Sequence, residues 1–84
     1  MKFYYITFRS VTYAQRGEQA LQKAGIRCTL LRTPKWMEER GCGYCLRLWT
    51  VDLEPALQVL NRAQVPMRKT YIQARDGQLE EWPK

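Results

Sequence analysis

Residues 2–26 read KFYYITFRSVTYAQRGEQALQKAGI, and this stretch decides the fold. Its opening residues, 2–8, are rich in aromatic and β-branched side chains, which favours a strand. Ser10 is a good N-cap for a helix over residues 11–24, where apolar residues recur at helical spacing. Gly25 follows at the point where a helix end favours a left-handed residue. The chain is therefore predicted to open with a strand and a helix.

The remaining sequence extends this unit. Further strands are predicted over residues 26–31, 44–51 and 68–73, and a second helix is capped by Asp52 and ends before Pro66. The resulting order is β-α-β-β-α-β. This order predicts an α+β, ferredoxin-like βαββαβ domain, with a four-stranded antiparallel sheet and both helices on one face.

The length of the chain, 84 residues, is enough for a single domain over residues 1–84, with residues 74–84 as a polar C-terminal tail. We see no apolar run of membrane-spanning length and no signal peptide, so we expect a cytoplasmic protein without a membrane partner. The net charge is +6, but the Lys and Arg residues are dispersed along the chain. Nucleic acid is therefore a possible binding partner, but it is less favoured than a protein partner.

The chain has three cysteines and no histidine. An odd cysteine count in a chain of cytosolic character argues against a structural disulfide framework. Without histidine, a Cys-His nucleophile pair cannot form, and three cysteines fall short of a closed zinc site. We therefore expect no metal and no cofactor.

The loop over residues 32–43 carries the most information about function. It is much longer than the two to five residues that usually join hairpin strands. Cys42 lies between Gly41 and Gly43, and neither glycine has a side chain that could shield the thiol. An exposed thiol of this kind is a candidate nucleophile, although Cys42 could also be an ordinary small residue in a tight turn.

The predicted topology brings this loop to the start of the first helix, because the first two strands run in the same direction. Cys42 should then face the helix N-terminus at Ser10. The positive end of a helix, together with Arg9 and Arg40, is an environment that favours the thiolate form of cysteine.

Cys45 forms a C-x-x-C pair with Cys42, but an extended chain would place the two Cα atoms roughly 10 Å apart. This exceeds the ~7 Å limit for a disulfide, so only a turn through Gly43-Tyr44 would close the gap. Cys45 is thus either a redox partner of Cys42 or a plain strand residue. Cys28 alternates with apolar residues and is expected in the core.

The sheet face that the helices leave open offers a second hypothesis. It would expose aromatic and cationic side chains that suit a second copy of the chain or single-stranded RNA. We favour the homodimer over RNA, since the third strand lacks the Gly-Phe-Gly-Phe type of signature. The side chains expected on this face are Phe3, Tyr5, Thr7, Cys45, Arg47, Trp49 and Tyr71.

Several segments together resemble the small bacterial family of selenium/sulfur carrier-like proteins. They are YYITFRS before the first helix, the stretch Ala14 to Ile26, TPK in the long loop and GCG at its end. The similarity covers residues 3–48. In that family the loop reads Pro-Thr-Pro-Arg and later Cys-Gly. Thr33, Pro34 and the Cys42-Gly43 pair match this pattern, whereas Arg32 and Lys35 depart from it.

The resemblance implies that Cys42 carries sulfur or selenium as a persulfide or selenosulfide. The partners would be a donor protein of the cysteine desulfurase type and an acceptor protein, and the chain would be a carrier rather than an enzyme. Other residues could assist the carrier thiol. They could bind the anionic sulfur or contact a partner, and Cys45 could resolve the persulfide. The residues are Arg9, Ser10, Thr33, Pro34, Lys35, Arg40, Gly41, Gly43, Cys45 and Arg47. The alternatives are a binding or assembly module that uses the open sheet face, and a Cys42-Cys45 dithiol redox protein.

Overall fold

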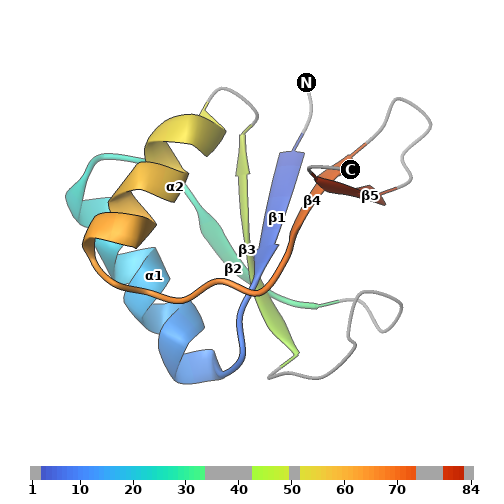
Figure 1. The fold of residues 1–84 in the computed structure, drawn as a ribbon, viewed down its shortest axis with the longest axis horizontal. Coiled ribbons are helices and arrows are strands. Elements are labelled where there is room, and N and C mark those ends of the chain that lie inside the picture. The colour runs from blue at the N-terminus through green and yellow to red at the C-terminus, as the bar shows by residue number, and fades with distance from the viewer. Residues whose placement is uncertain (1–2, 34–42, 50–51, 74–78, 83–84) are drawn as a thin grey trace.

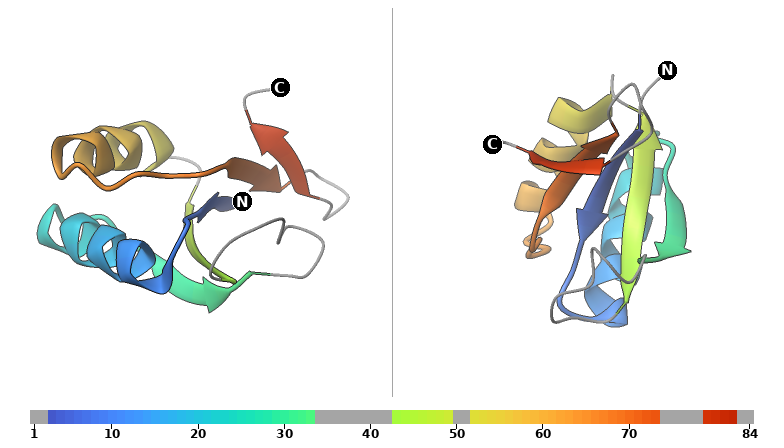
Figure 2. Two further views of the ribbon diagram at one scale, coloured as in Figure 1. Left: turned by 60° about the horizontal axis from the view of Figure 1, so that its bottom comes forward. Right: turned by 90° about the vertical axis from the view of Figure 1, so that its right-hand side faces the viewer.

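The structure is a computed structural model, and its described residues are 3–33, 43–49, 52–73 and 79–82. Its strands and helices are β1 (Phe3–Thr7), α1 (Val11–Lys23), β2 (Thr29–Arg32), β3 (Tyr44–Trp49), α2 (Leu53–Arg62), β4 (Thr70–Gln73) and β5 (Leu79–Trp82). The strands form one antiparallel sheet in the order β2-β3-β1-β4-β5. Figures 1 and 2 show both helices against the same face of this sheet. The domain is therefore α+β, as predicted.

The predicted number of four strands is wrong, because a fifth strand lies in the stretch expected to be a polar tail. β5 pairs with β4 from Thr70↔Trp82 to Gln73↔Leu79. Its central residues are both glutamates, so the sequence has no apolar alternation that would indicate a strand. The backbone edge of β4 provides the pairing instead.

Two strands, β2 and β4, begin later than predicted. β2 begins at Thr29 rather than Ile26, because the Ile26 N–H donates to the Leu21 carbonyl at 2.9 Å and so completes the end of α1. Gly25 has the left-handed backbone that this ending needs, with φ +76°. β3 ends at Trp49, and residues 50–51 lie outside the described part of the chain.

The core lies between the sheet and the two helices. The side chains predicted to point inward from β1 and β3 are all buried there, and α1 and α2 close the other side. The core-facing residues are Tyr4, Ile6, Phe8, Leu46 and Leu48 from the sheet and Ala14, Leu21, Leu53, Ala56 and Leu60 from the helices. The predicted alternation of β1 and β3 is confirmed.

Gly17 allows α1 to pack closely on this core. A Cβ atom at this position would lie 3.2 Å from Leu46, 3.2 Å from Leu60 and 3.3 Å from Phe8. These neighbours come from the sheet and from α2. Because Gly17 has no side chain, α1 can lie close to both. Gly17 therefore marks a close contact of α1 with the sheet and with α2.

The start of α2 differs from the prediction. Asp52 occupies the N-cap position, but its side chain makes no capping hydrogen bond, and its backbone is helical at φ −97° and ψ −1°. A capping side chain requires an extended backbone at this position, as Ser10 has before α1. Neither α1 nor α2, the helices of the described residues, is long and apolar enough to cross a membrane.

Candidate functional site

The candidate site lies at the end of the sheet where β1 finishes and β3 begins. Thr7 at the end of β1 pairs with Cys45, and Arg32 at the end of β2 pairs with Tyr44. The Thr33 N–H then donates to the Gly43 carbonyl at 2.6 Å. Figures 1 and 2 show the start of α1 and the start of β3 at the same end of the molecule. The prediction that the Ser10 turn and the Gly43 end of the loop lie at the same edge of the sheet is confirmed.

The start of α1 is capped at Ser10. The Ser10 Oγ accepts a hydrogen bond from the Tyr13 N–H at 3.3 Å, and the Ser10 backbone is extended at φ −143° and ψ 158°. The predicted N-cap is therefore confirmed. The remaining N–H groups of the first turn give this end of the helix a partial positive charge. Arg9, which is exposed, adds a full charge next to it.

The backbone of two basic residues that sequence reasoning did not assign to the site, Arg68 and Lys69, also lies at this end of the sheet. The Lys69 ammonium lies 3.8 Å from the Glu81 carboxylate, so its charge is paired. The Arg68 N–H donates to the Thr7 carbonyl at 2.8 Å, and the Thr7 N–H donates to the Lys69 carbonyl at 2.8 Å. The Thr7 hydroxyl also accepts from the Lys69 N–H at 3.1 Å. The only signal in the sequence was that Arg68 and Lys69 are adjacent basic residues, and the strand pairing that brings them to Thr7 is tertiary.

Gly43 is the described residue nearest in sequence to the predicted carrier thiol. Its φ of +71° lies in the left-handed region, which a side chain would resist, so glycine is needed where β3 begins. Cys42 lies outside the described residues, and the predictions for it are not tested here. The same holds for the predicted residues Pro34, Lys35, Arg40 and Gly41.

Cys45 belongs to the sheet face opposite the helices, as its pairing with Thr7 and Leu31 shows. The prediction that its side chain is exposed on that face is wrong, because Cys45 has 0% exposed surface. Thr7 and Tyr71, also expected to be exposed on this face, are buried as well. Alternation along a strand determines the face of the sheet but not whether that part of the face is covered.

Cys28 packs against the edge of the core, as predicted, although it precedes β2. Burial, together with the nearby negative charge of Glu18, raises the pKa of its thiol to about 11. Desolvation is the larger cause, since a thiolate loses hydration there. Both Cys28 and Cys45 are thiols in the structure. The part of the chain that the structure describes contains no group of three or more potential metal-ligating side chains.

We expect Cys28 to react slowly with iodoacetamide in the native protein at neutral pH. Because the thiolate is the reactive form, the rate should rise about ten-fold per pH unit and level off only near the raised pKa of about 11. Peptide mass spectrometry of the alkylated protein across a pH series measures this rate. A rate that levels off near pH 8.5, the ordinary value for cysteine, would contradict the raised pKa.

Arg47 does not join the site at Ser10. Its guanidinium carbon lies 4.6 Å from the centre of the Phe3 ring, near the other end of β1. Phe3 in turn stacks on Trp49 with ring centres 4.2 Å apart. The structure therefore places Arg9, Ser10, Thr33 and Gly43 at one end of the sheet and Arg47 nearer the other end.

Comparison with known proteins places this chain in a family. Residues 3–72 match the family described as "Putative Se/S carrier protein-like". The chain belongs to this family. The match takes in β1 to β4 of the Se/S carrier-like protein, including the strands and helix that form the Ser10–Gly43 end of the sheet. No curated protein and no solved structure matches it significantly.

Proposed function

We propose that this Se/S carrier-like protein carries sulfur or selenium as a persulfide or selenosulfide on the thiol of Cys42. Family membership supports a carrier role, and the chemistry of the other cysteines supports the choice of residue. A carrier thiol has to reach the sulfur atom of a partner protein and has to ionise near neutral pH.

The observation that carries the proposal is that the two described cysteines fail these requirements. Cys45 has no exposed surface, so a partner cannot reach it in this conformation. Cys28 has a pKa of about 11, so only a very small fraction of it is thiolate at neutral pH. Cys42 is the third and last cysteine of the chain.

The charges at the Ser10–Gly43 end of the sheet also support the proposal. The positive end of α1 and the exposed Arg9 lie at the end of the sheet where the chain enters β3 at Gly43. Arg68 is held at the same end by its backbone bond to Thr7, whereas the charge of Lys69 is paired with Glu81. Positive charge of this kind stabilises a thiolate and, after loading, the anionic form of a persulfide.

Loading needs no external oxidant. The Cys42 thiolate attacks the terminal sulfur of the donor's persulfide, a new S–S bond forms, and the donor's S–S bond breaks. The electron pair of the broken bond leaves on the donor cysteine as its thiolate. Unloading is the same exchange with an acceptor as the attacking group, and selenium takes the place of the terminal sulfur in a selenosulfide.

The hypothesis of a Cys42-Cys45 dithiol makes a further demand on the structure. Thr7 and Leu31 flank Cys45 in the neighbouring strands, and its side chain is fully buried. Reaction with Cys42 would require this part of β3 to move. We therefore propose that Cys42 acts alone and that Cys45 is a packing residue.

Incubation with a cysteine desulfurase and L-cysteine tests the carrier role. Intact-protein mass spectrometry should show a gain of one sulfur atom, and a thiol reductant should remove it. A reaction in which a known persulfide acceptor is loaded and this protein is not would contradict the proposal.

A further inference from the structure

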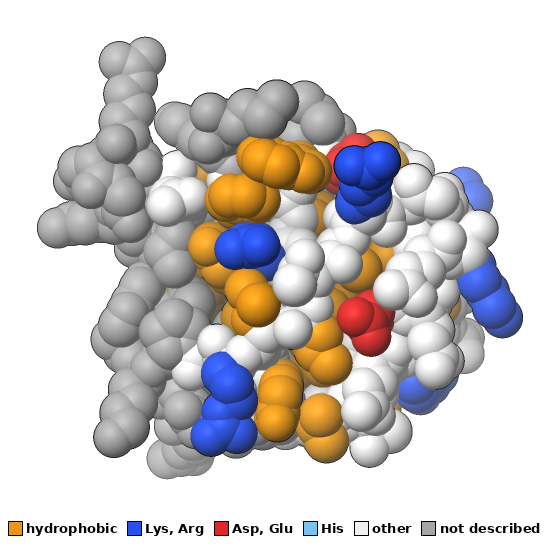
Figure 3. Space-filling view, turned by 180° about the vertical axis from the view of Figure 1, so that it is seen from behind, with side chains coloured by type: hydrophobic (Ala, Val, Ile, Leu, Met, Phe, Trp, Pro, Cys, Tyr) orange, Lys and Arg blue, Asp and Glu red, His pale blue; other side chains and the backbone are white. Residues whose placement is uncertain are grey.

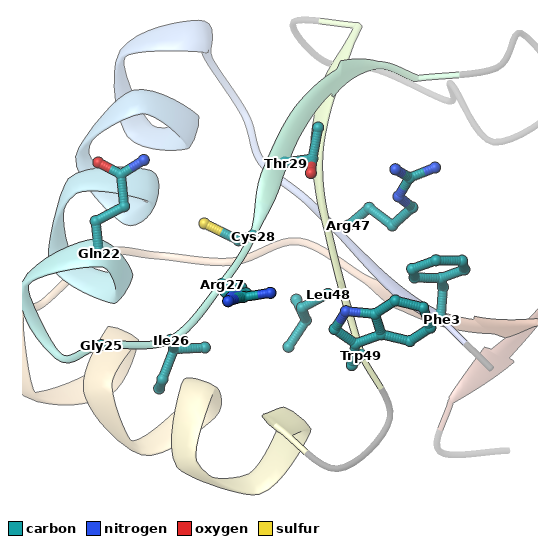
Figure 4. Close-up of a pocket in the computed structure, with 10 residues that line it drawn as sticks. All are labelled: Phe3, Gln22, Gly25, Ile26, Arg27, Cys28, Thr29, Arg47, Leu48 and Trp49. Atoms are coloured by element: carbon teal, nitrogen blue, oxygen red, sulfur yellow. The ribbon is translucent and has the colours of Figure 1, made fainter. Parts of the chain in front are cut away.

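A pocket of about 610 Å³ lies at the opposite end of the sheet from Gly43. The start of β1, the end of α1, the segment leading into β2 and the end of β3 surround it (Figure 4). Binding sites for small molecules typically measure roughly 300–1,000 Å³, so the pocket is large enough for such a ligand. Along β3, Tyr44 and Trp49 are separated by roughly 17 Å at ~3.3 Å per residue, so this pocket is distinct from the carrier site.

One wall of the pocket is aromatic. Phe3 and Trp49 are paired across β1 and β3, and their rings stack at 4.2 Å with an angle of 28°. Figure 4 shows this ring pair on one side of the pocket. Both side chains are only partly buried, unlike Cys45 and Tyr71 on the same sheet face. Two of the partly accessible aromatic side chains of this face therefore lie at the pocket.

The lining is also cationic. Arg27 and Arg47 are its charged residues, and no carboxylate is among the lining residues. Burial and, to a lesser extent, the charge of the Glu18 carboxylate raise the pKa of the lining residue Cys28, but Glu18 itself does not line the pocket. Among the described residues, no carboxylate forms an ion pair with Arg27 or Arg47. Figure 3 shows the same combination on the side turned away in Figure 1, with Lys and Arg side chains set among apolar ones.

We propose that this pocket binds a nucleotide, with the base stacked on Trp49 and the phosphate held by Arg27. Arg47 lies over the face of Phe3 that is turned away from Trp49 and supports this aromatic wall. A planar base is the ligand part that an exposed indole recognises without regard to sequence. Guanidinium groups bind phosphate oxygens with paired N–H donors. A simple anion would make no contact with the aromatic wall, and an apolar ligand would bury the guanidinium of Arg27 without an acceptor. Thr29 also lines the pocket and supplies a hydroxyl group for the edge of the base.

Titration calorimetry with adenosine 5′-monophosphate tests the proposal. We expect saturable binding, and binding at least about ten-fold weaker for adenosine and for inorganic phosphate, because each lacks one half of the recognised group. A hexamer of adenylate that binds more tightly than the monophosphate would identify the ligand as single-stranded RNA. Equal affinity would identify a free nucleotide.

Variants locate the binding. Arg27→Gln should weaken binding of the monophosphate about ten-fold, and so should Trp49→Ala. Arg27 is exposed, so its variant should fold even where Trp49→Ala does not. Arg62→Gln is the matched control, because Arg62 is an exposed cation on α2 outside the lining. Cys42→Ser should bind like the unmodified chain, which separates this proposal from the carrier function.

The proposal is overturned if neither the monophosphate nor the hexamer binds, or if inorganic phosphate binds as tightly as the monophosphate. It is equally overturned if Arg62→Gln lowers the affinity as much as Arg27→Gln, since binding would then follow the net charge of +6 rather than the pocket.

Discussion

Replacing Cys42 with serine is expected to abolish loading by a cysteine desulfurase, because a hydroxyl cannot form the S–S bond that holds the transferred sulfur. The expected loss is complete. Cys28→Ser is the matched control, since it removes one thiol from the chain and leaves the proposed carrier in place. It should load to the same extent as the unmodified chain, because the raised pKa of Cys28 keeps that thiol protonated at neutral pH.

The two variants are compared by intact mass after the same incubation with donor and L-cysteine. Circular dichroism of both variants shows whether the fold is intact, so that loss of loading is not confused with loss of structure. Loading that persists in Cys42→Ser and disappears in Cys28→Ser would contradict the proposed function.

Replacing Gly17 with leucine is expected to lower the free energy of unfolding by about 3 kcal/mol, the upper part of the range for overpacked cores. Even a single Cβ atom at this position would lie 3.2–3.3 Å from Leu46, Leu60 and Phe8. A leucine side chain would have to displace residues of the sheet and of α2 together. The gain from removing a helical glycine, about 1 kcal/mol, is too small to offset this.

Gln19→Leu is the control for this prediction. Gln19 is exposed on the same helix, so leucine there should change stability by less than about 0.5 kcal/mol. Urea denaturation followed by circular dichroism gives both values. Equal stability of the two variants would mean that α1 can move away from the sheet without cost.

This packing matters for the candidate site because α1 carries Ser10. The close contact at Gly17 holds α1 against Leu46 of β3, and β3 begins at the Gly43 end of the loop. The position of the helix N-terminus relative to the start of β3 therefore depends on a residue that lies two turns into the helix.

Local signals in the sequence were enough to predict the first half of the fold. Ser10 caps α1 and Gly25 ends it in a left-handed conformation, because both roles depend on one residue and its own backbone. The alternation in β1 and β3 likewise separated the core side chains from those of the opposite face. These local features are sufficient to place Ser10 and Gly43 at the same end of the sheet.

The features that sequence reasoning missed depend on contacts between distant segments. β5 forms through backbone pairing with β4, and its polar side chains give no periodic signal. Cys45 was assigned to the correct face, but its burial depends on what covers that face. Arg68 and Lys69 reach the site through bonds to Thr7, more than sixty residues earlier in the chain.

The most direct test of the account is to locate the transferred atom in the unmodified chain. After loading from a cysteine desulfurase, exposed thiols and persulfides are trapped by alkylation, and the peptides are analysed by mass spectrometry. The account predicts the added sulfur on the peptide that contains Cys42 and on no other cysteine. Sulfur found on Cys28 or Cys45 with Cys42 unmodified would contradict it.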